Sequence, residues 1–231
     1  PYTTLFRSVD GLTLVGPLLL SFDKKVAFYK NWKPLFLSLF LMMLVFVPWD
    51  VAFTENQIWG FNEKYLCGIY LFKLPIEEIL FFIVVPYACV FIYACLNYYI
   101  KSDVLLKTHR TISVILIIVL VVTAACNLEK LYTTITFFGT SFFLLYHVFK
   151  KTPWFSKFLL AYFVSIVPFI IVNSLLTGSS IEGEVVWYNS DHILNVRLGT
   201  IPVEDLFYSL LMLGLTIHIF ENFRGNSKKF R

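Results

Sequence analysis

Two short motifs in this chain place a pair of adjacent acidic residues directly after a proline. The first spans Pro75–Glu78 (PIEE) and the second spans Pro202–Asp205 (PVED). Proline suits the first position of a helix, and acids in the first turn suit the helix dipole, so each motif predicts a helix start. Adjacent helical residues point about 100° apart, so one acid of each pair can face a bundle centre while the other braces it.

The position of these acids indicates acid/base chemistry. Each pair stands immediately before a long apolar segment, where ionisable groups are costly and usually functional. Burial next to a second carboxylate favours the protonated form of a carboxyl group, which can then act as a general acid. We therefore predict an acid/base set made of Glu77, Glu78, Glu204 and Asp205.

The two motifs belong to a longer internal repeat. Residues 60–97 align without gaps on residues 187–224, at an offset of 127 positions. Upstream, Asp50-x-x-x-Thr54 resembles Asn173-x-x-x-Thr177. Because Asp50 and Asn173 precede the acid pairs, we expect them to brace the carboxyl groups by hydrogen bonding. The expected supporting residues are Asp50, Asn173, Pro75 and Pro202.

Composition indicates that the elements carrying these acids lie in a membrane. Of the 231 residues, 58% are hydrophobic and 15% are charged, whereas a soluble domain usually has about 25% charged residues. This excludes disorder, a nucleic-acid module and most soluble enzymes. A membrane helix needs roughly 20 apolar residues. The chain contains seven uncharged runs: Gly11–Phe22, Pro34–Trp49, Ile79–Ile100, Thr111–Leu128, Leu131–Phe149, Phe158–Ile181 and Leu206–Phe220.

The sequence therefore predicts an all-α integral membrane protein with seven transmembrane helices in a 3-1-3 parallel internal repeat. The linker helix lets the second three-helix unit run in the same direction as the first, as in other parallel-repeat membrane proteins. The expected units are residues 9–105 for the first repeat, 106–129 for the linker helix, 130–224 for the second repeat and 225–231 for a basic tail. Residues 1–8 (PYTTLFRS) resemble a translated sequencing adapter, and we expect them to be non-native.

Charge gives the expected orientation. Fourteen of the 19 Lys and Arg residues follow the first, third, fifth and seventh predicted spans. Cytoplasmic loops are enriched in Lys and Arg. The prediction is a protein of the bacterial cytoplasmic membrane with its N-terminus outside, its C-terminus in the cytoplasm and both acid motifs on the outer side.

The segments around the acids resemble a known family. LPIEEILFF and IPVEDLFYSLL, with WGFN-x-x-Y-L-x-G-I-Y before the first and VVWYN before the second, resemble the small membrane-integral lycopene β-cyclases of the two-domain type. These occur in bacteria as fused or heterodimeric chains and in fungi joined to phytoene synthase. The resemblance covers about residues 11–224. It implies a non-redox isomerase or intramolecular lyase that closes the linear ψ-ends of lycopene to β-ionone rings, through a carbocation, giving γ-carotene or β-carotene.

The resemblance also bears on the aromatic residues near the acids, on cofactors and on partners. Aromatic faces stabilise cations by roughly 0.5–2 kcal/mol, so the aromatic residues after the motifs are candidates to contact substrate: Phe81, Phe82, Tyr87, Phe207 and Tyr208. No GxGxxG and no CxxC pair occurs in the sequence, so we expect no flavin, nicotinamide or metal cofactor. The expected partners are lycopene, membrane lipid and other enzymes of the carotenoid pathway, with no nucleic acid.

Other functions compete with this interpretation. Small-solute transporters also use 3-1-3 repeats, and a non-catalytic carotenoid-binding protein would leave the acids idle. A retinal protein would need a Schiff-base lysine in the last span, and Leu206–Phe220 contains none. The residues do not select the proton donor or decide whether both repeats carry active sites.

Overall fold

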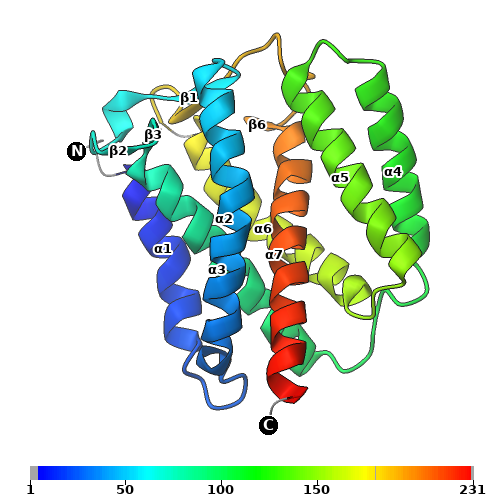
Figure 1. Ribbon diagram of the computed structural model, residues 1–231. Coiled ribbons are helices and arrows are strands. Elements are labelled where there is room, and N and C mark those ends of the chain that lie inside the picture. The colour runs from blue at the N-terminus through cyan, green and yellow to red at the C-terminus, as the bar shows by residue number, and fades with distance from the viewer. Residues whose placement is uncertain (1–4, 180, 230–231) are drawn as a thin grey trace.

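The computed structural model describes residues 5–179 and 181–229, with side chains as far as residue 225 (Figure 1). These residues form seven α-helices: α1 Leu5–Leu20, α2 Trp32–Glu55, α3 Ile76–Tyr99, α4 His109–Ala125, α5 Leu131–Lys150, α6 Phe155–Leu176 and α7 Val203–Lys229. Short 3-10 turns occur at Phe28–Asn31 and Glu63–Tyr65. Helix α4 packs along α5 on the outside of the bundle.

Four helical segments are long and apolar enough to cross a membrane: Phe28–Glu55, Ile76–Tyr99, Phe155–Leu176 and Val203–Gly225. They fit an integral membrane protein. The other helices are shorter or more polar. Helices α1 and α4 have 16 and 17 residues, and at 1.5 Å per residue they fall short of a bilayer core of about 30 Å. Helix α5 has 20 residues but contains several Thr, Ser and Tyr side chains. Seven spans therefore remain a prediction.

The two ends of the bundle differ in chemistry. The α1–α2, α3–α4 and α5–α6 connections lie at the same end as the C-terminus, and these are the loops rich in Lys (Figure 1). The opposite end holds three short antiparallel strand pairs. These are β1 Trp59–Phe61 with β4 Val186–Tyr188, β2 Tyr70–Leu71 with β3 Leu74–Pro75, and β5 Arg197–Leu198 with β6 Ile201–Pro202. Each of the last two pairs is a hairpin that leads directly into α3 or α7.

Residues 127 positions apart make matching backbone contacts. The amide of Ile76 donates to the carbonyl of Ile69 at 2.9 Å, and the amide of Val203 donates to Val196 at the same distance. Strands β1 and β4 pair so that Gly60 lies opposite its counterpart Trp187. A Cβ on Gly60 would clash with the Trp187 indole, so this crossing requires glycine. The contacts between helices repeat as well. Helix α1 packs on α3, and their counterparts α5 and α7 pack on each other. Helix α2 packs on α7, and their counterparts α6 and α3 pack on each other.

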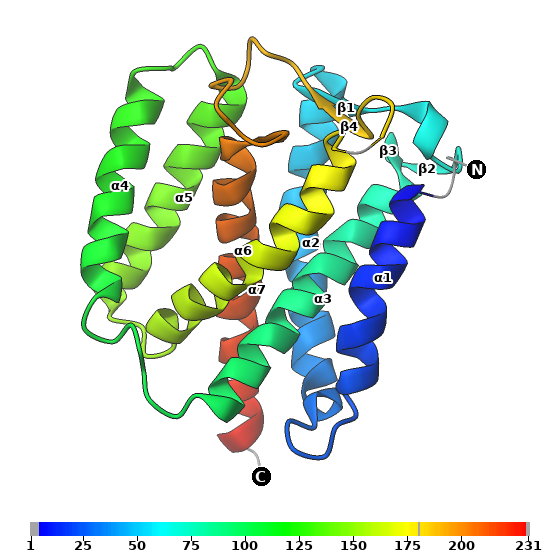
Figure 2. The ribbon, with the colours of Figure 1, turned by 180° about the vertical axis from the view of Figure 1, so that it is seen from behind.

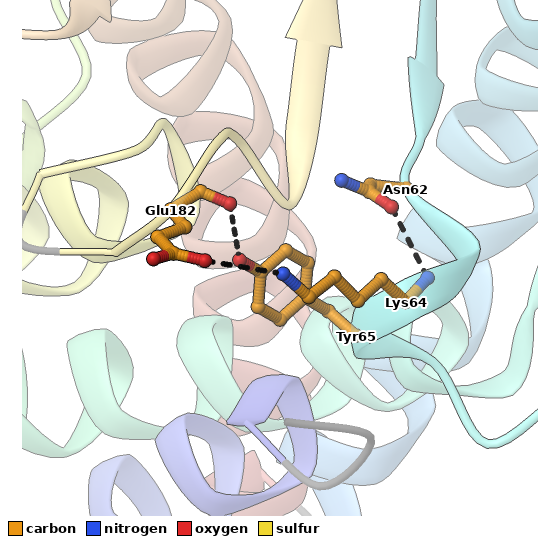
Figure 3. Close-up of polar contacts among 4 residues, drawn as sticks. All are labelled: Asn62, Lys64, Tyr65 and Glu182. Carbon is orange, nitrogen blue, oxygen red and sulfur yellow. Dashed lines mark hydrogen bonds and ion pairs between the residues drawn. The ribbon is translucent and has the colours of Figure 1, made fainter. Parts of the chain in front are cut away.

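A polar contact joins the loops of the two halves at the hairpin end (Figure 3). The Tyr65 hydroxyl donates to the carbonyl of Glu182 at 2.6 Å, and the Lys64 ammonium lies 3.6 Å from the Glu182 carboxylate. Asn62 holds the turn by accepting the amide of Lys64 at 3.1 Å. The 3-10 turn Glu63–Tyr65, between β1 and the hairpin, is therefore anchored to the loop that follows α6.

The predicted non-native segment falls partly within α1. Residues 1–4 lie outside the described residues, and residues 5–8 form the first turns of the helix. Phe6 is fully buried in a cluster that includes Tyr65 and Leu66. Phe6 therefore packs against the turn at Tyr65 and Leu66, and the origin of residues 1–8 remains a prediction.

Candidate active site

A cavity of about 430 Å³ lies between α1, α3, α6 and α7, beneath strands β1 and β4. Its walls are mainly apolar. Three carboxyl side chains line it: Asp50 from α2, Glu78 from α3 and Asp205 from α7. Glu78 and Asp205 are counterparts in the repeat, so a single cavity receives one acid from each half.

Asp205 is held by three hydrogen-bond donors. The hydroxyl of Tyr132 donates to Oδ1 at 2.7 Å, and the hydroxyl of Tyr188 donates to Oδ2 at 2.8 Å. The amide group of Asn173 lies 3.5 Å from Oδ2. Burial, and then the neighbouring Asp205 carboxylate, raise the pKa of Tyr188 well above its usual value. Tyr188 therefore stays protonated and remains a donor to Asp205.

Glu78 has a different environment. It lies within electrostatic reach of Asp50 and Asp205, and no hydrogen bond to its carboxyl group occurs among the described residues. Asp50 is 3% exposed, and its Oδ2 has no partner among the same residues. Asp205 therefore has the most hydrogen-bond donors of the three cavity acids, and Glu78 has the fewest.

The first acid of each pair points away from the cavity. The Oε1 atom of Glu77 accepts the backbone amide of Cys67 at 2.8 Å, with the Arg7 guanidinium 3.7 Å away. The Oε1 atom of Glu204 accepts the backbone amide of Leu194 and the hydroxyl of Thr133, both at 2.6 Å. Cys67 and Leu194 are counterparts at the offset of 127, so Glu77 and Glu204 make the same contact in both halves. Each fully buried carboxyl group fastens the segment before its helix.

The predicted supporting residues take distinct places. Asp50 and Asn173 line the cavity. Pro75 pairs with Tyr70 in one hairpin, and Pro202 pairs with Arg197 in the other. The prolines therefore set the direction in which each acid pair enters its helix and do not line the cavity themselves.

Some of the predicted aromatic residues line the cavity, and others do not. Phe81 and Tyr208 line the cavity. Phe82 is buried in the helix core, and the ring of Phe207 packs on Phe137 at 5.1 Å. The hydroxyl of Tyr87 bonds Ser21 at 2.7 Å, towards the other end of the bundle. Phe82, Tyr87 and Phe207 are therefore not positioned to contact a ligand in this cavity.

Comparison with known proteins identifies the family. The family model described as lycopene cyclase matches residues 3–96 and 129–223, which is most of the chain. This chain belongs to the lycopene cyclase family. The segment between the two matched regions contains α4, the predicted linker helix.

One curated relative of this lycopene cyclase family member is a bifunctional lycopene cyclase/phytoene synthase from the fungus Leptosphaeria maculans. The two are 32% identical over 98 residues, which is 42% of this chain and 15% of the fungal protein. No solved structure matches the chain.

The structure adds site residues that sequence reasoning missed. Trp59, Tyr132, Tyr162 and Tyr188 all line the cavity. Tyr188 lies inside the VVWYN segment, so its place in the repeat was a usable signal. Tyr132 carried no such signal, because it lies at the start of α5, outside both acid motifs, and reaches Asp205 only through tertiary packing.

Asp10 is a further carboxyl group that the sequence analysis passed over. It lies in α1, is 4% exposed, and has no partner for either oxygen among the described residues. It lies within electrostatic reach of Glu77 and Glu78. A single acid in an apolar segment was a usable signal, but it stands beside the predicted adapter sequence. Among the described residues, no group of three or more His, Cys, Asp or Glu side chains could hold a metal ion.

Proposed function

We propose that this chain is a lycopene β-cyclase whose two halves share one active site. The observation that carries the proposal is the cavity, where Glu78 and Asp205 come together within mainly apolar walls. Family membership supports a linear carotenoid as the substrate. The positions of the acids do not favour the transporter alternative, because Glu78 and Asp205 lie in the first turns of α3 and α7 and not at mid-helix.

The proposed reaction transfers protons and involves no net oxidation. A carboxyl group donates a proton to the terminal double bond of a ψ-end, which leaves a carbocation. The next double bond of the chain attacks this cation and closes the ring. A carboxylate then removes a proton from the ring, so one proton is added and one is lost. This chemistry is that of an isomerase or intramolecular lyase, and it needs no flavin, nicotinamide or metal.

The surroundings of the two acids support a different role for each. Hydrogen bonds to a carboxylate favour its charged form, whereas neighbouring negative charge favours the neutral form of a carboxyl group. Asp205 receives donors from Tyr132, Tyr188 and Asn173, so it serves as the base. Glu78 lies beside Asp50 and Asp205, so it serves as the proton donor.

The remaining walls stabilise the intermediate. Phe81, Trp59 and Tyr208 line the same cavity as the acids, and aromatic faces attract a cation by about 0.5–2 kcal/mol each. Apolar walls also keep water away from the carbocation, which would otherwise be captured as an alcohol.

Removing one donor to the base is expected to slow ring formation without stopping it. Tyr188→Phe deletes a 2.8 Å hydrogen bond to Asp205. A hydrogen bond to a charged group contributes about 1.5–3 kcal/mol, so we expect roughly a 10- to 100-fold lower turnover. The measurement is the rate of lycopene loss by purified protein in liposomes. Tyr98→Phe, at an exposed tyrosine on α3, is the matched control and should match the wild type.

We also propose the membrane architecture that goes with this function. It has seven spans in a 3-1-3 repeat, and the matching contacts of Cys67 with Glu77 and of Leu194 with Glu204 support the repeat. The N-terminus would lie outside a bacterial cytoplasmic membrane and the basic loops inside it. Carotenoid-pathway enzymes that supply lycopene would be neighbours in the same membrane.

Expression in cells that accumulate lycopene tests the function. The expected products, separated by chromatography, carry one or two β-ionone rings. If lycopene remains linear while the protein is well expressed in the membrane, the cyclase proposal is wrong. Carotenoid that co-purifies unchanged would then favour a non-catalytic binding protein.

A further inference from the structure

The cavity reaches the molecular surface sideways, between α1 and α6. Leu12 of α1 and Ile171 of α6 both line it, yet they are 79% and 61% exposed. Pro168 of α6 also lines the cavity and is exposed. Helix α3 runs between these two helices on the same face of the bundle (Figure 2), and its Phe81 and Val85 line the cavity. The cavity therefore has a lateral opening in the helical wall.

The rim of this opening is apolar. Leu12, Pro168 and Ile171 carry no polar side-chain atoms, and the exposed residues beside them on the same helices, Val15 and Val167, are also apolar. Asp50 and Asp205 lie deeper, at 3% and 5% exposed, and Glu78 is half-buried. A lipophilic molecule can therefore reach the acids from lipid without crossing the polar loops at the hairpin end.

Corresponding positions in the two halves of the described chain carry side chains of very different size. Val172 precedes Asn173 on α6 and lines the cavity. Trp49 precedes Asp50 on α2, where it stacks on Phe46 with ring centroids 5.5 Å apart and meets Tyr208 at 5.4 Å. The large indole packs between α2 and α7, whereas the smaller valine lines the cavity beside α6. Helices α2 and α5 contribute one residue each to the lining.

We propose that the gap between α1 and α6 is the entrance through which one end of a linear carotenoid reaches Glu78 and Asp205. The rest of the molecule stays in the surrounding lipid. This inference rests on the proposed cyclase function. Because the described residues form one cavity with one acid from each half, a substrate places a single end group there per binding event. A second ring then requires the one-ring product to leave and to enter again from its other end.

Bulky residues at the rim test the entrance. Leu12→Trp and Ile171→Trp narrow it, and their matched controls are Leu19→Trp and Val164→Trp, each seven residues away on the same helix. The control positions are 68% and 41% exposed and do not line the cavity. With lycopene dissolved in liposomes, we expect the rim variants to lower the initial rate by about tenfold or more, because small errors in substrate placement have large effects. The controls should stay within about twofold of the wild type.

A second measurement does not depend on catalysis. Leu12→Cys and Leu19→Cys are labelled with a membrane-permeant maleimide, and labelling is quantified at each peptide by mass spectrometry. Lycopene in the liposomes should slow labelling at position 12 and leave position 19 unchanged.

The outcomes separate this inference from the proposed function. If the wild type forms no rings, the proposed function fails. If the wild type is active, the entrance is overturned when the rim variants behave like their controls, or when lycopene protects positions 12 and 19 equally. Equal loss of activity in all four tryptophan variants also overturns it, because the effect would then come from bulk on the lipid face.

Discussion

Glu78→Gln and Asp205→Asn are each expected to lower ring formation by about 10²–10⁴-fold, the usual contribution of a positioned proton transfer. Both substitutions keep the size of the side chain and remove its ability to donate or accept the reacting proton. The measurement is product formation per amount of folded protein in lycopene-containing liposomes. Glu129→Gln, at an exposed position in the α4–α5 turn, is the control for a changed charge and should match the wild type.

The products distinguish the two roles. Without the proton donor, Glu78→Gln should slow the reaction and leave the ring type unchanged. Without the base, Asp205→Asn still allows the cation to form, and the cation can lose a proton from a different carbon. Asp205→Asn should therefore yield a larger share of ring isomers. Wild-type rates in both variants would show that the cavity acids do not perform the chemistry.

Glu204→Leu is expected to destabilise the folded protein by about 2–5 kcal/mol, because burying unpaired polar groups costs roughly 1–3 kcal/mol each. The substitution leaves the amide of Leu194 and the hydroxyl of Thr133 without their acceptor at 2.6 Å. Thr133→Val removes only one of these bonds, so it should cost about 1–2 kcal/mol. Thermal unfolding in detergent micelles measures both effects.

Glu204→Gln provides the discriminating comparison for this site. The glutamine carbonyl can still accept the Leu194 amide, so we expect ring formation per folded protein to remain within about tenfold of the wild type. Glu77→Gln should behave in the same way through Cys67. If Glu204→Gln folds fully but loses as much ring formation as Glu78→Gln, then Glu204 is a catalytic residue. That result would contradict the assignment of one structural and one catalytic acid to each pair.

Much of this arrangement could be predicted from local sequence. The Pro-x-acid-acid motifs predicted two helix starts, and α3 and α7 begin at Ile76 and Val203. The predicted resemblance to lycopene cyclases is confirmed by the family match. The helical class is confirmed as well, and four apolar helices fit a membrane protein. Helix propensity, apolar run length and sequence similarity are properties of short segments, which is why they are readable without a structure.

The roles within each acid pair could not be predicted in this way. Adjacent helical residues point about 100° apart, so the sequence shows that only one acid can face the centre but does not show which. The choice depends on the rotation of α3 and α7, which is set by packing and by the amides of Cys67 and Leu194 that hold Glu77 and Glu204. The same holds for Tyr132, which reaches Asp205 across 73 positions of sequence.

The sequence alone determined that the protein carries two acid pairs at repeated helix starts in an apolar chain. Only the tertiary structure decided that Glu78 and Asp205 share one cavity and that the cavity opens beside α6 and not beside α2. The physical reason is side-chain volume and packing: Trp49 packs against Phe46 and Tyr208, whereas the smaller Val172 lines the cavity. In the described residues, a repeat with matching backbone contacts thereby contributes one acid from each half to the same cavity.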